Sequence, residues 1–342
     1  MGLSISVLVP CFNEEQTIAA CVRGILAQTR MPDEIIIIND GSTDKSRAVL
    51  ETFGAVIKIV DTPKNTGAKS YAQEYGMRFV TGDVVVMTDA DTFFATDFIA
   101  RVESHFANPE VGAVAGYVKS SSGNWLTACR ELDYIFGQDV HKRAQGHLNA
   151  IIVIPGCAAA FRTDAFRRVV TFDHDTITED LDITYKFHAA SLRIVYDMEA
   201  VVYSQDPETL SSYIKQMRRW VSGGWQNLAK HWKTVLQRPG HALEITLTYG
   251  EGMVFGAVVF LMPLLSVRFT LIFLSMYWVV PAAIATYGSL RRRRFDLLMY
   301  APAFPFILLL NTYIFLEQFI LVMLFGKVPT FWFKPERRTV TV

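Results

Sequence analysis

Short apolar runs, rich in β-branched residues, alternate with stretches of helical periodicity over the first third of the chain. The runs and the helical stretches between them are, in chain order, 5–10, 14–28, 34–39, 44–53, 56–61, 68–80 and 83–88. Nearly continuous apolar strands that alternate with helices are typical of a parallel sheet with helices on both faces. Ligands of such sheets bind beyond the carboxyl ends of the strands. Polar residues that directly follow a strand are therefore candidates for a functional site.

Two of these strand ends carry polar loops. Pro10, Asn13 and Glu14 lie in the loop after the first strand, and Asp40 follows four consecutive isoleucines of the second. A carboxylate at this point could accept a hydrogen bond from the imide of uracil or from a ribose hydroxyl. The alternative is that residues 40–44 form only a turn and a helix N-cap.

The fourth strand ends in the pair Asp89 and Asp91. In an extended backbone, residues two apart point to the same side. Two neighbouring carboxylates repel each other unless a cation offsets their charge. Mg²⁺ or Mn²⁺ prefers such oxygen ligands, so this pair is a predicted metal site.

A lysine opens the helix between the third and fourth strands. Lys69 follows Gly67 and Ala68, and a cation at such a helix start could contact uracil or a phosphate. The alternative is a solvated lysine in the first turn.

Two short motifs follow in the second half of the chain. The first, Thr178-Glu179-Asp180, opens an apolar-periodic segment, and an acid at a helix start stays ionised. Asp180 could therefore serve as a base, with Glu179 beside it. In the second motif, Gln216, Arg219 and Trp220 share one helical face. They offer an amide, a cation for phosphate and a flat ring on which a sugar can stack.

The ordered motifs resemble those of family 2 glycosyltransferases, and among them the membrane-bound synthases of cellulose, hyaluronan, chitin oligomers and poly-N-acetylglucosamine. The T-E-D and Q-x-x-R-W signatures occur here in the family's order. The resemblance implies a GT-A-like α/β fold and an inverting transfer from a UDP-sugar to a growing β-linked polysaccharide. It also implies that Asp91 ligates Mg²⁺ or Mn²⁺ and that Asp89 lies near the ribose. N-acetylglucosamine is the expected sugar, with glucose as the second choice. A non-processive transferase that acts on a lipid-linked acceptor is the alternative.

The expected binding residues fall into two groups. We expect the UDP-sugar donor to contact Pro10, Asn13, Glu14, Asp40, Lys69, Asp89 and Arg219. We expect the acceptor to contact Gly156, Cys157, Gln216 and Trp220. Small residues around Gly156 and Cys157 would let a polymer end approach the backbone, although a core strand that needs small side chains explains them equally well. We interpret Asp173, His174 and Asp175 as a loop rather than a metal cluster.

The last third of the chain is strongly apolar. Residues 269–290 are uncharged over a length that can span ~30 Å of hydrocarbon, and four arginines follow at 291–294, which indicates a cytoplasmic loop. Residues 253–267 reach a spanning length only if Glu251 is included. Residues 297–326 are ambiguous, and we favour an interfacial helix with a bent or re-entrant element over a single span. Glu317 within this stretch could line a polymer path or make a structural contact.

These patterns predict three regions. They are a cytosolic glycosyltransferase domain at 1–235, interfacial and transmembrane helices at 236–326, and a cytosolic tail at 327–342. In the tail, Trp332 and Arg337 could close over bound nucleotide or anchor the chain at the membrane surface. We expect a multi-pass protein of the plasma membrane, with a partner subunit or oligomer for translocation because its helices are few.

Composition agrees with this interpretation. The formal net charge of +0 gives no general attraction to nucleic acid. The mean hydropathy is +0.24, raised by the last third of the chain. The four cysteines lie far apart, so we expect reduced thiols in a cytosolic domain, and a strand-like run beginning at Ile5 leaves no room for a signal peptide.

Overall fold

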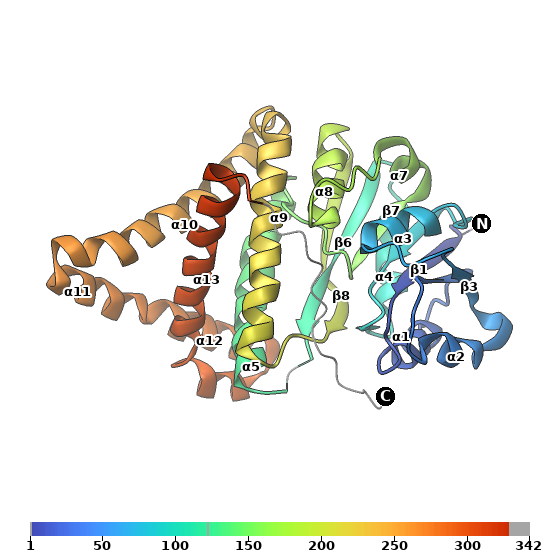
Figure 1. Cartoon of the computed structure of the whole chain (residues 1–342), viewed down its shortest axis with the longest axis horizontal. Helices are drawn as coiled ribbons and strands as arrows, with labels where there is room; N and C mark the ends of the chain where they lie inside the picture. Colours follow the sequence, from blue (N-terminus) through green and yellow to red (C-terminus); the bar gives the residue numbers. More distant parts are fainter. Residues whose placement is uncertain (1, 122, 328–342) are drawn as a thin grey trace. The chain divides into compact units, whose positions relative to one another are not determined.

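The structure is a computed structural model that describes residues 2–121 and 123–327. It divides the chain into two compact units (Figure 1). The first unit comprises residues 2–119 and 153–205, and the second comprises residues 120–152 together with the described residues from 206 onward. The long helix that follows Asn124 and the helix that carries Gln216 therefore pack with the apolar C-terminal helices.

The first unit is built on a sheet flanked by helices. Among the described residues, its strands are β1 (Ile5–Cys11), β2 (Glu34–Asn39), β3 (Lys58–Asp61), β4 (Val84–Met87), β5 (Thr92–Phe94), β6 (Val111–Ser120), β7 (Ala159–Arg162) and β8 (Arg193–Ser204). The helices between them are α1 (Ile18–Leu26), α2 (Ser46–Glu51), η1 (Gly54–Val56), α3 (Lys69–Gly76), α4 (Phe98–His105), α7 (Thr163–Val169) and α8 (Glu179–Ala189). The strand order is β3-β2-β1-β4-β7-β6-β8-β5.

The sheet is mixed. Strands β3, β2, β1 and β4 pair in parallel, as predicted for this part of the chain, whereas β7 pairs antiparallel with both β4 and β6, and β5 pairs antiparallel with β8. The chain moves outward from β1 to β3 and then returns past β1 to β4. Because crossover connections are right-handed, this reversal puts α3 on the face opposite to α1 and α2. The GT-A-like fold with helices on both faces is thus confirmed.

The point of reversal lies between β1 and β4, which are direct neighbours. In sheets of this kind the ligand-binding position is the carboxyl end of the strands at such a reversal. The buried core below it consists of Ile35–Ile38 of β2 and Val84–Val86 of β4, each at most 4% exposed. This core fixes where the loops after β1, β2 and β4 begin.

The second unit is helical among the residues that the structure describes. Its elements are α5 (Trp125–Tyr134), the π-helix η2 (Ile135–Lys142), α6 (Arg143–His147), α9 (Leu210–Leu236), α10 (Pro239–Leu265), α11 (Val267–Tyr277), α12 (Val279–Arg292), η3 (Phe295–Tyr300), α13 (Phe304–Phe319) and the π-helix η4 (Ile320–Leu324). The first three follow one another without a break, and Asn124 caps them at the start by accepting from the N–H groups of Leu126 and Thr127.

Helix α9 begins later than expected. The pattern at Pro207 and Glu208 predicts a helix start there, but the observed N-cap is Thr209, whose hydroxyl accepts from the N–H of Ser212. The hydroxyl satisfies a backbone donor of the first turn of α9.

Within the part of the chain that the structure describes, three helical segments are long and apolar enough to cross a membrane, namely 239–265, 267–292 and 304–324. Helices α10 and α11 extend together as a hairpin in Figure 1. By length and composition the chain is a membrane protein.

Helix α13 packs along α9 through polar contacts. The hydroxyl of Tyr213 donates to Oδ1 of Asn311 (2.7 Å), and the guanidinium of Arg218 forms two hydrogen bonds of 2.7 and 2.6 Å with the carboxylate of Glu317. Of the two roles considered for Glu317, the structure thus supports the protein-facing contact. Pairing with Arg218 offsets the cost of an acid in an apolar segment.

Candidate active site

The loops after β1 and β2 are held together by Asn13. Its side-chain oxygen accepts from the N–H groups of Thr43 (2.7 Å) and Asp44 (3.3 Å), and its own N–H donates to Oγ of Ser42. Asn13 has a φ of 55°, a left-handed conformation that asparagine tolerates better than most residues. Of the predicted donor-contact residues, Pro10 lies in β1, whereas Asn13 and Glu14 lie on the loop that follows it, which is fixed against the loop after Asp40.

The Asp40 carboxylate binds the loop that precedes α3. Its Oδ1 accepts from the hydroxyl of Thr62 (2.9 Å) and the N–H of Thr66 (3.0 Å), and its Oδ2 accepts from the hydroxyl of Thr66 (2.7 Å). The N–H of Ser46, the first residue of α2, donates instead to Oδ1 of Asp44. Asp40 therefore does not cap α2, and its expected contact with uracil or ribose remains a prediction.

The Asp89–Asp91 segment is a turn. The N–H of Thr92 donates to the carbonyl of Asp89 (3.1 Å), so the extended geometry expected for the pair is wrong. The two residues differ in solvent exposure. Asp91 is 6% exposed, whereas the side chain of Asp89 is 35% exposed. Both carboxylates nevertheless lie at the carboxyl end of β4, where the strand order reverses.

Lys69 joins two distant acidic segments. As the first residue of α3, it places its ammonium group against a carboxylate oxygen of Asp89 and 3.3 Å from Oε1 of Glu179. Its side chain is only 14% exposed, so the alternative of a solvated lysine is wrong. Burial opposes the charge, but Asp89 and Glu179 outweigh it and raise the pKa of Lys69 above its ordinary value. The lysine therefore stays charged and brings the ends of β4 and the start of α8 together.

Gly156 lies within the same cluster. A Cβ atom at this position would come within 3.0 Å of the Lys69 ammonium and 3.6 Å of the Cβ of Asp180. The N–H of Gly156 donates to Oδ2 of Asp180 at 3.4 Å. The hydroxyl of Thr184 accepts from the N–H of Ile154 and donates to the carbonyl of Asp180, which ties this segment to α8. The close approach explains why a small residue stands here.

Asp180 has a shifted acidity. Burial, followed by the neighbouring charge of Glu179, raises the pKa of its carboxyl group to about 6, while Lys69 and the N–H groups of Leu181 and Gly156 act in the opposite direction. At neutral pH the group is mostly ionised and is a stronger base than an ordinary aspartate. A carboxylate with this pKa is suited to remove a proton near pH 7.

Cys157 adjoins this cluster through its backbone. The hydroxyl of Thr88, at the end of β4, donates to the carbonyl of Cys157 (2.9 Å). Burial, and then the charge of Asp89, raises the pKa of the Cys157 thiol well above its usual range. The thiol thus stays protonated and is a poor nucleophile. All four cysteines are free thiols, as expected.

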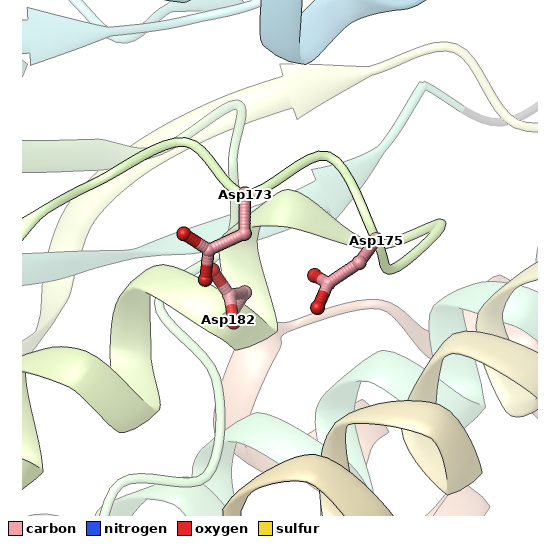
Figure 2. A group of neighbouring side chains, drawn as sticks. All are labelled: Asp173, Asp175 and Asp182. Atoms are coloured by element: carbon pink, nitrogen blue, oxygen red, sulfur yellow. The ribbon is translucent and has the colours of Figure 1, made fainter.

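A second group of acids lies beside the start of α8. Figure 2 shows the carboxylates of Asp173, Asp175 and Asp182, whose oxygens lie within 4.8 Å of one another. The Lys186 ammonium lies 2.7 Å from Asp173 and 2.6 Å from Asp182, so it offsets part of their charge. Asp173 and Asp175 are on an irregular segment, which agrees with the loop interpretation.

The Q-x-x-R-W motif lies on α9 in the second unit. Gln216 is 7% exposed, and its Oε1 accepts no hydrogen bond from any residue that the structure describes. Arg219 and Trp220 are half-buried. A buried amide oxygen without a donor is costly, which is consistent with a ligand-binding position.

Trp225, five residues after Trp220 on α9, has a structural role. Its ring packs against Tyr249, Phe315 and Phe319, with centroid distances of 4.7, 5.0 and 4.9 Å, and its indole N–H donates to the carbonyl of Phe315. The predicted gating residues Trp332 and Arg337 lie outside the described residues.

Comparison with known proteins identifies the family of the chain. A profile described as "Glycosyltransferase like family 2" matches residues 3–223, and the chain belongs to this family. It is thus a glycosyltransferase with apolar helices that follow the catalytic fold.

Among curated relatives, the chain is 32% identical over 236 residues to a poly-β-1,6-N-acetyl-D-glucosamine synthase of Staphylococcus epidermidis, which covers 68% of this chain and 57% of the relative. It is 30% identical over 247 residues to a synthase of the same name from Staphylococcus aureus strain COL, covering 71% of this chain and 60% of the relative. The chain therefore spans about three fifths of the length of the curated relatives it matches.

A solved structure confirms the fold. A mannosyltransferase from Pyrobaculum calidifontis, in complex with GDP-Man and Mn²⁺, superposes with a TM-score of 0.65. The two chains are 21% identical, and the match covers 89% of this chain and 87% of the other. At this identity the likeness concerns the fold alone.

Proposed function

We propose that the protein is an inverting, metal-dependent hexosyltransferase that elongates a β-linked polysaccharide from a UDP-sugar donor, with N-acetylglucosamine as the favoured sugar. The observation that carries the proposal is the pairing of Lys69 with both Asp89 and Glu179. It gathers the acids at the end of β4 and the predicted base at the start of α8 into one cluster. The two staphylococcal relatives, both named as poly-β-1,6-N-acetyl-D-glucosamine synthases, favour that sugar and product.

In this mechanism Asp180 removes the proton from the acceptor hydroxyl as that oxygen attacks the anomeric carbon of the donor. The bond from this carbon to the UDP oxygen breaks on the opposite side, so the configuration inverts. The pKa of about 6 lets Asp180 accept the proton at neutral pH. The N–H groups of Gly156 and Leu181 donate to Oδ2 and Oδ1 of Asp180 respectively, so both carboxylate oxygens are held in place. After transfer, the base returns its proton to water.

The donor set of the cluster fits a divalent cation. Asp89, Asp91, Glu179 and Asp180, together with Lys69, carry a formal charge of −3 when all are ionised. Lys69 offsets only part of this charge, and hard oxygen ligands suit Mg²⁺ or Mn²⁺. Asp91 and Asp89 would hold the ion, which when bound supplies positive charge to the diphosphate leaving group. The Pyrobaculum mannosyltransferase, which was solved with Mn²⁺, is consistent with this choice.

On α9, Arg219 would contact the diphosphate, Trp220 would stack on the acceptor sugar, and Gln216 would direct its buried amide to a sugar hydroxyl. The unsatisfied oxygen of Gln216 supports this assignment. Pro10 near the end of β1 and the loop residues Asn13, Glu14 and Asp40 would surround the nucleotide.

The proposed location is the plasma membrane, with the catalytic fold in the cytosol and two crossings, by α10 and by α11 with α12. Helix α13 would lie at the membrane surface, because its polar contacts run along α9, which carries the proposed catalytic face. The basic run at 291–294 and Lys327 would then be on the same side. Polymer export would use a partner subunit or a second copy.

The test is product analysis after a UDP-release assay on the purified membrane protein across a panel of UDP-sugars. We expect UDP release with UDP-N-acetylglucosamine and a polymeric product. A single added sugar would indicate a non-processive transferase with a lipid-linked acceptor. Binding without UDP release would contradict enzymatic function.

A further inference from the structure

The indole ring of Trp220 rests on a buried arginine that belongs to no sequence motif. The guanidinium carbon Cζ of Arg130, on α5, lies 4.6 Å from the Trp220 ring centroid and 4.5 Å from that of Tyr134. Arg130 is 3% exposed. A guanidinium between two aromatic rings favours a fixed, stacked arrangement of all three planes.

Arg130 is itself held by acids. Its Nη1 donates to Asp133 at 2.7 Å, and its Nε lies 3.8 Å from a carboxylate oxygen of Asp206, just before α9. The hydroxyl of Tyr134 donates to the same oxygen of Asp206 at 3.0 Å. The guanidinium therefore cannot move without breaking contacts to α5 and to the segment that leads into α9.

Trp220 is not fully enclosed by the protein. It is half-buried against an apolar cluster that includes Leu132, Ile135 and Met217. Apolar packing alone permits a ring to shift in its plane or turn about its side-chain torsions. The planar cation adds a directional contact, which defines the tilt of the exposed part of the indole.

We propose that Arg130 is a positioning residue that sets the orientation of Trp220 for stacking on the acceptor sugar. This inference rests on the proposed function, in which Trp220 holds the end of the polymer. Loosening the ring would weaken retention of the acceptor between transfers, so the enzyme would release shorter chains. Binding of the UDP-sugar and transfer of each unit involve other residues and would change little.

The experiment uses the full-length protein in detergent or nanodiscs, with its six tryptophans replaced by 5-fluorotryptophan. The Trp220 fluorine resonance is the one missing from Trp220→Phe. We expect Arg130→Met to shift or broaden this resonance and leave the others in place. Arg130→Lys keeps the charge but not the planar stack, so it should give the same change to a smaller extent. If Arg130→Met does not fold, Arg130→Lys serves as the test variant.

Product length is the second measurement, with UDP-N-acetylglucosamine as donor. We expect Arg130→Met to shorten the polymer about threefold or more, with the KM for donor within about twofold of wild type. In the Trp220→Leu background, Arg130→Met should shorten the polymer no further, because no ring remains through which the arginine can act. Arg101→Met is the control, since Arg101 pairs with Asp97 at the surface of the first unit and should leave both readouts unchanged.

The inference would be overturned if Arg130→Met left the Trp220 resonance in place or left the product length unchanged. It would also be overturned if the KM for donor rose by the same factor as the product length fell. A different failure identifies the proposed function as the error. If the wild-type protein makes no polymer while Arg130→Met still shifts the Trp220 resonance, the contact holds, but the acceptor role of both residues is refuted.

Discussion

Lys69 and Glu179 form an ion pair of 3.3 Å between the first turn of α3 and the first residue of α8. The same ammonium also contacts Asp89, so one lysine links the predicted metal-binding segment to the predicted catalytic one. The acidity of Asp180 depends on this arrangement, because Glu179 raises its pKa and Lys69 lowers it. Two substitutions should therefore shift the activity in opposite directions along the pH axis.

Activity should depend on a group with a pKa of about 6. Asp180 must be ionised to act as a base, so kcat/KM for the UDP-sugar should rise with pH, reach half its maximum near pH 6 and level off above it. Glu179→Gln removes the like charge that raises this pKa. The acidic limb should then move to lower pH. A limb that stays in place or moves upward in this variant would contradict the assignment.

Lys69→Met should move the acidic limb of the kcat/KM profile to higher pH. Loss of the positive charge raises the pKa of Asp180 above 6, so less of the base is ionised at neutral pH. We expect roughly a tenfold lower kcat/KM at pH 7, with partial recovery at higher pH. Lys64→Met is the control, because Lys64 is exposed and should leave the profile unchanged. Equal losses at every pH would show that Lys69 does not act through Asp180.

Metal dependence distinguishes the two acidic clusters. Treatment with EDTA should abolish UDP release, and added Mn²⁺ or Mg²⁺ should restore it. Asp91→Asn should raise the Mn²⁺ concentration for half-maximal UDP release at least about tenfold, because a buried ligand is lost. Asp175→Asn, in the cluster beside Lys186, should leave this Mn²⁺ concentration unchanged. The reverse pattern would move the predicted metal site to Asp173, Asp175 and Asp182.

The proposed membrane topology has two crossings, by α10 and by α11 with α12, and keeps α13 at the membrane surface. Single cysteines placed at Lys64, Arg291 and Lys327, in a protein without its native cysteines, can be labelled with an impermeant maleimide in inside-out and right-side-out vesicles. We expect all three to react from the same side, because only α10 and the pair α11 and α12 cross. Labelling of position 327 from the opposite side would show that α13 is a third crossing.

The sequence predicts the sheet well where the signal is local. The isoleucine run and the valine run define β2 and β4, and the loops after them carry the polar residues. The sequence could not predict the antiparallel β7, because the small residues of Ala159–Ala160 fit a strand or an acceptor loop equally well. Strand direction depends on long-range pairing with β4, which no local pattern encodes.

In the candidate site, too, the sequence predicts local features but not long-range contacts. Asp180, Lys69 and Asp89 stand out by motif and position, but the ion pair that joins Lys69 to Glu179 connects residues more than a hundred positions apart. The roles of Thr62 and Thr66 as partners of Asp40 carry no signal beyond ordinary loop composition. Arg130 is one of many charged residues on a long amphipathic helix. Its burial beneath Trp220 becomes evident only when α5 and α9 are packed together.

The most direct test of the account is the Asp180→Asn variant, measured for UDP release with UDP-N-acetylglucosamine and for UDP binding by calorimetry. Asparagine keeps the size of the side chain and cannot accept the proton, so UDP release should fall at least about a thousandfold while the affinity for UDP stays within about twofold of wild type. Undiminished UDP release by this variant would show that Asp180 is not the base and would contradict the proposed mechanism.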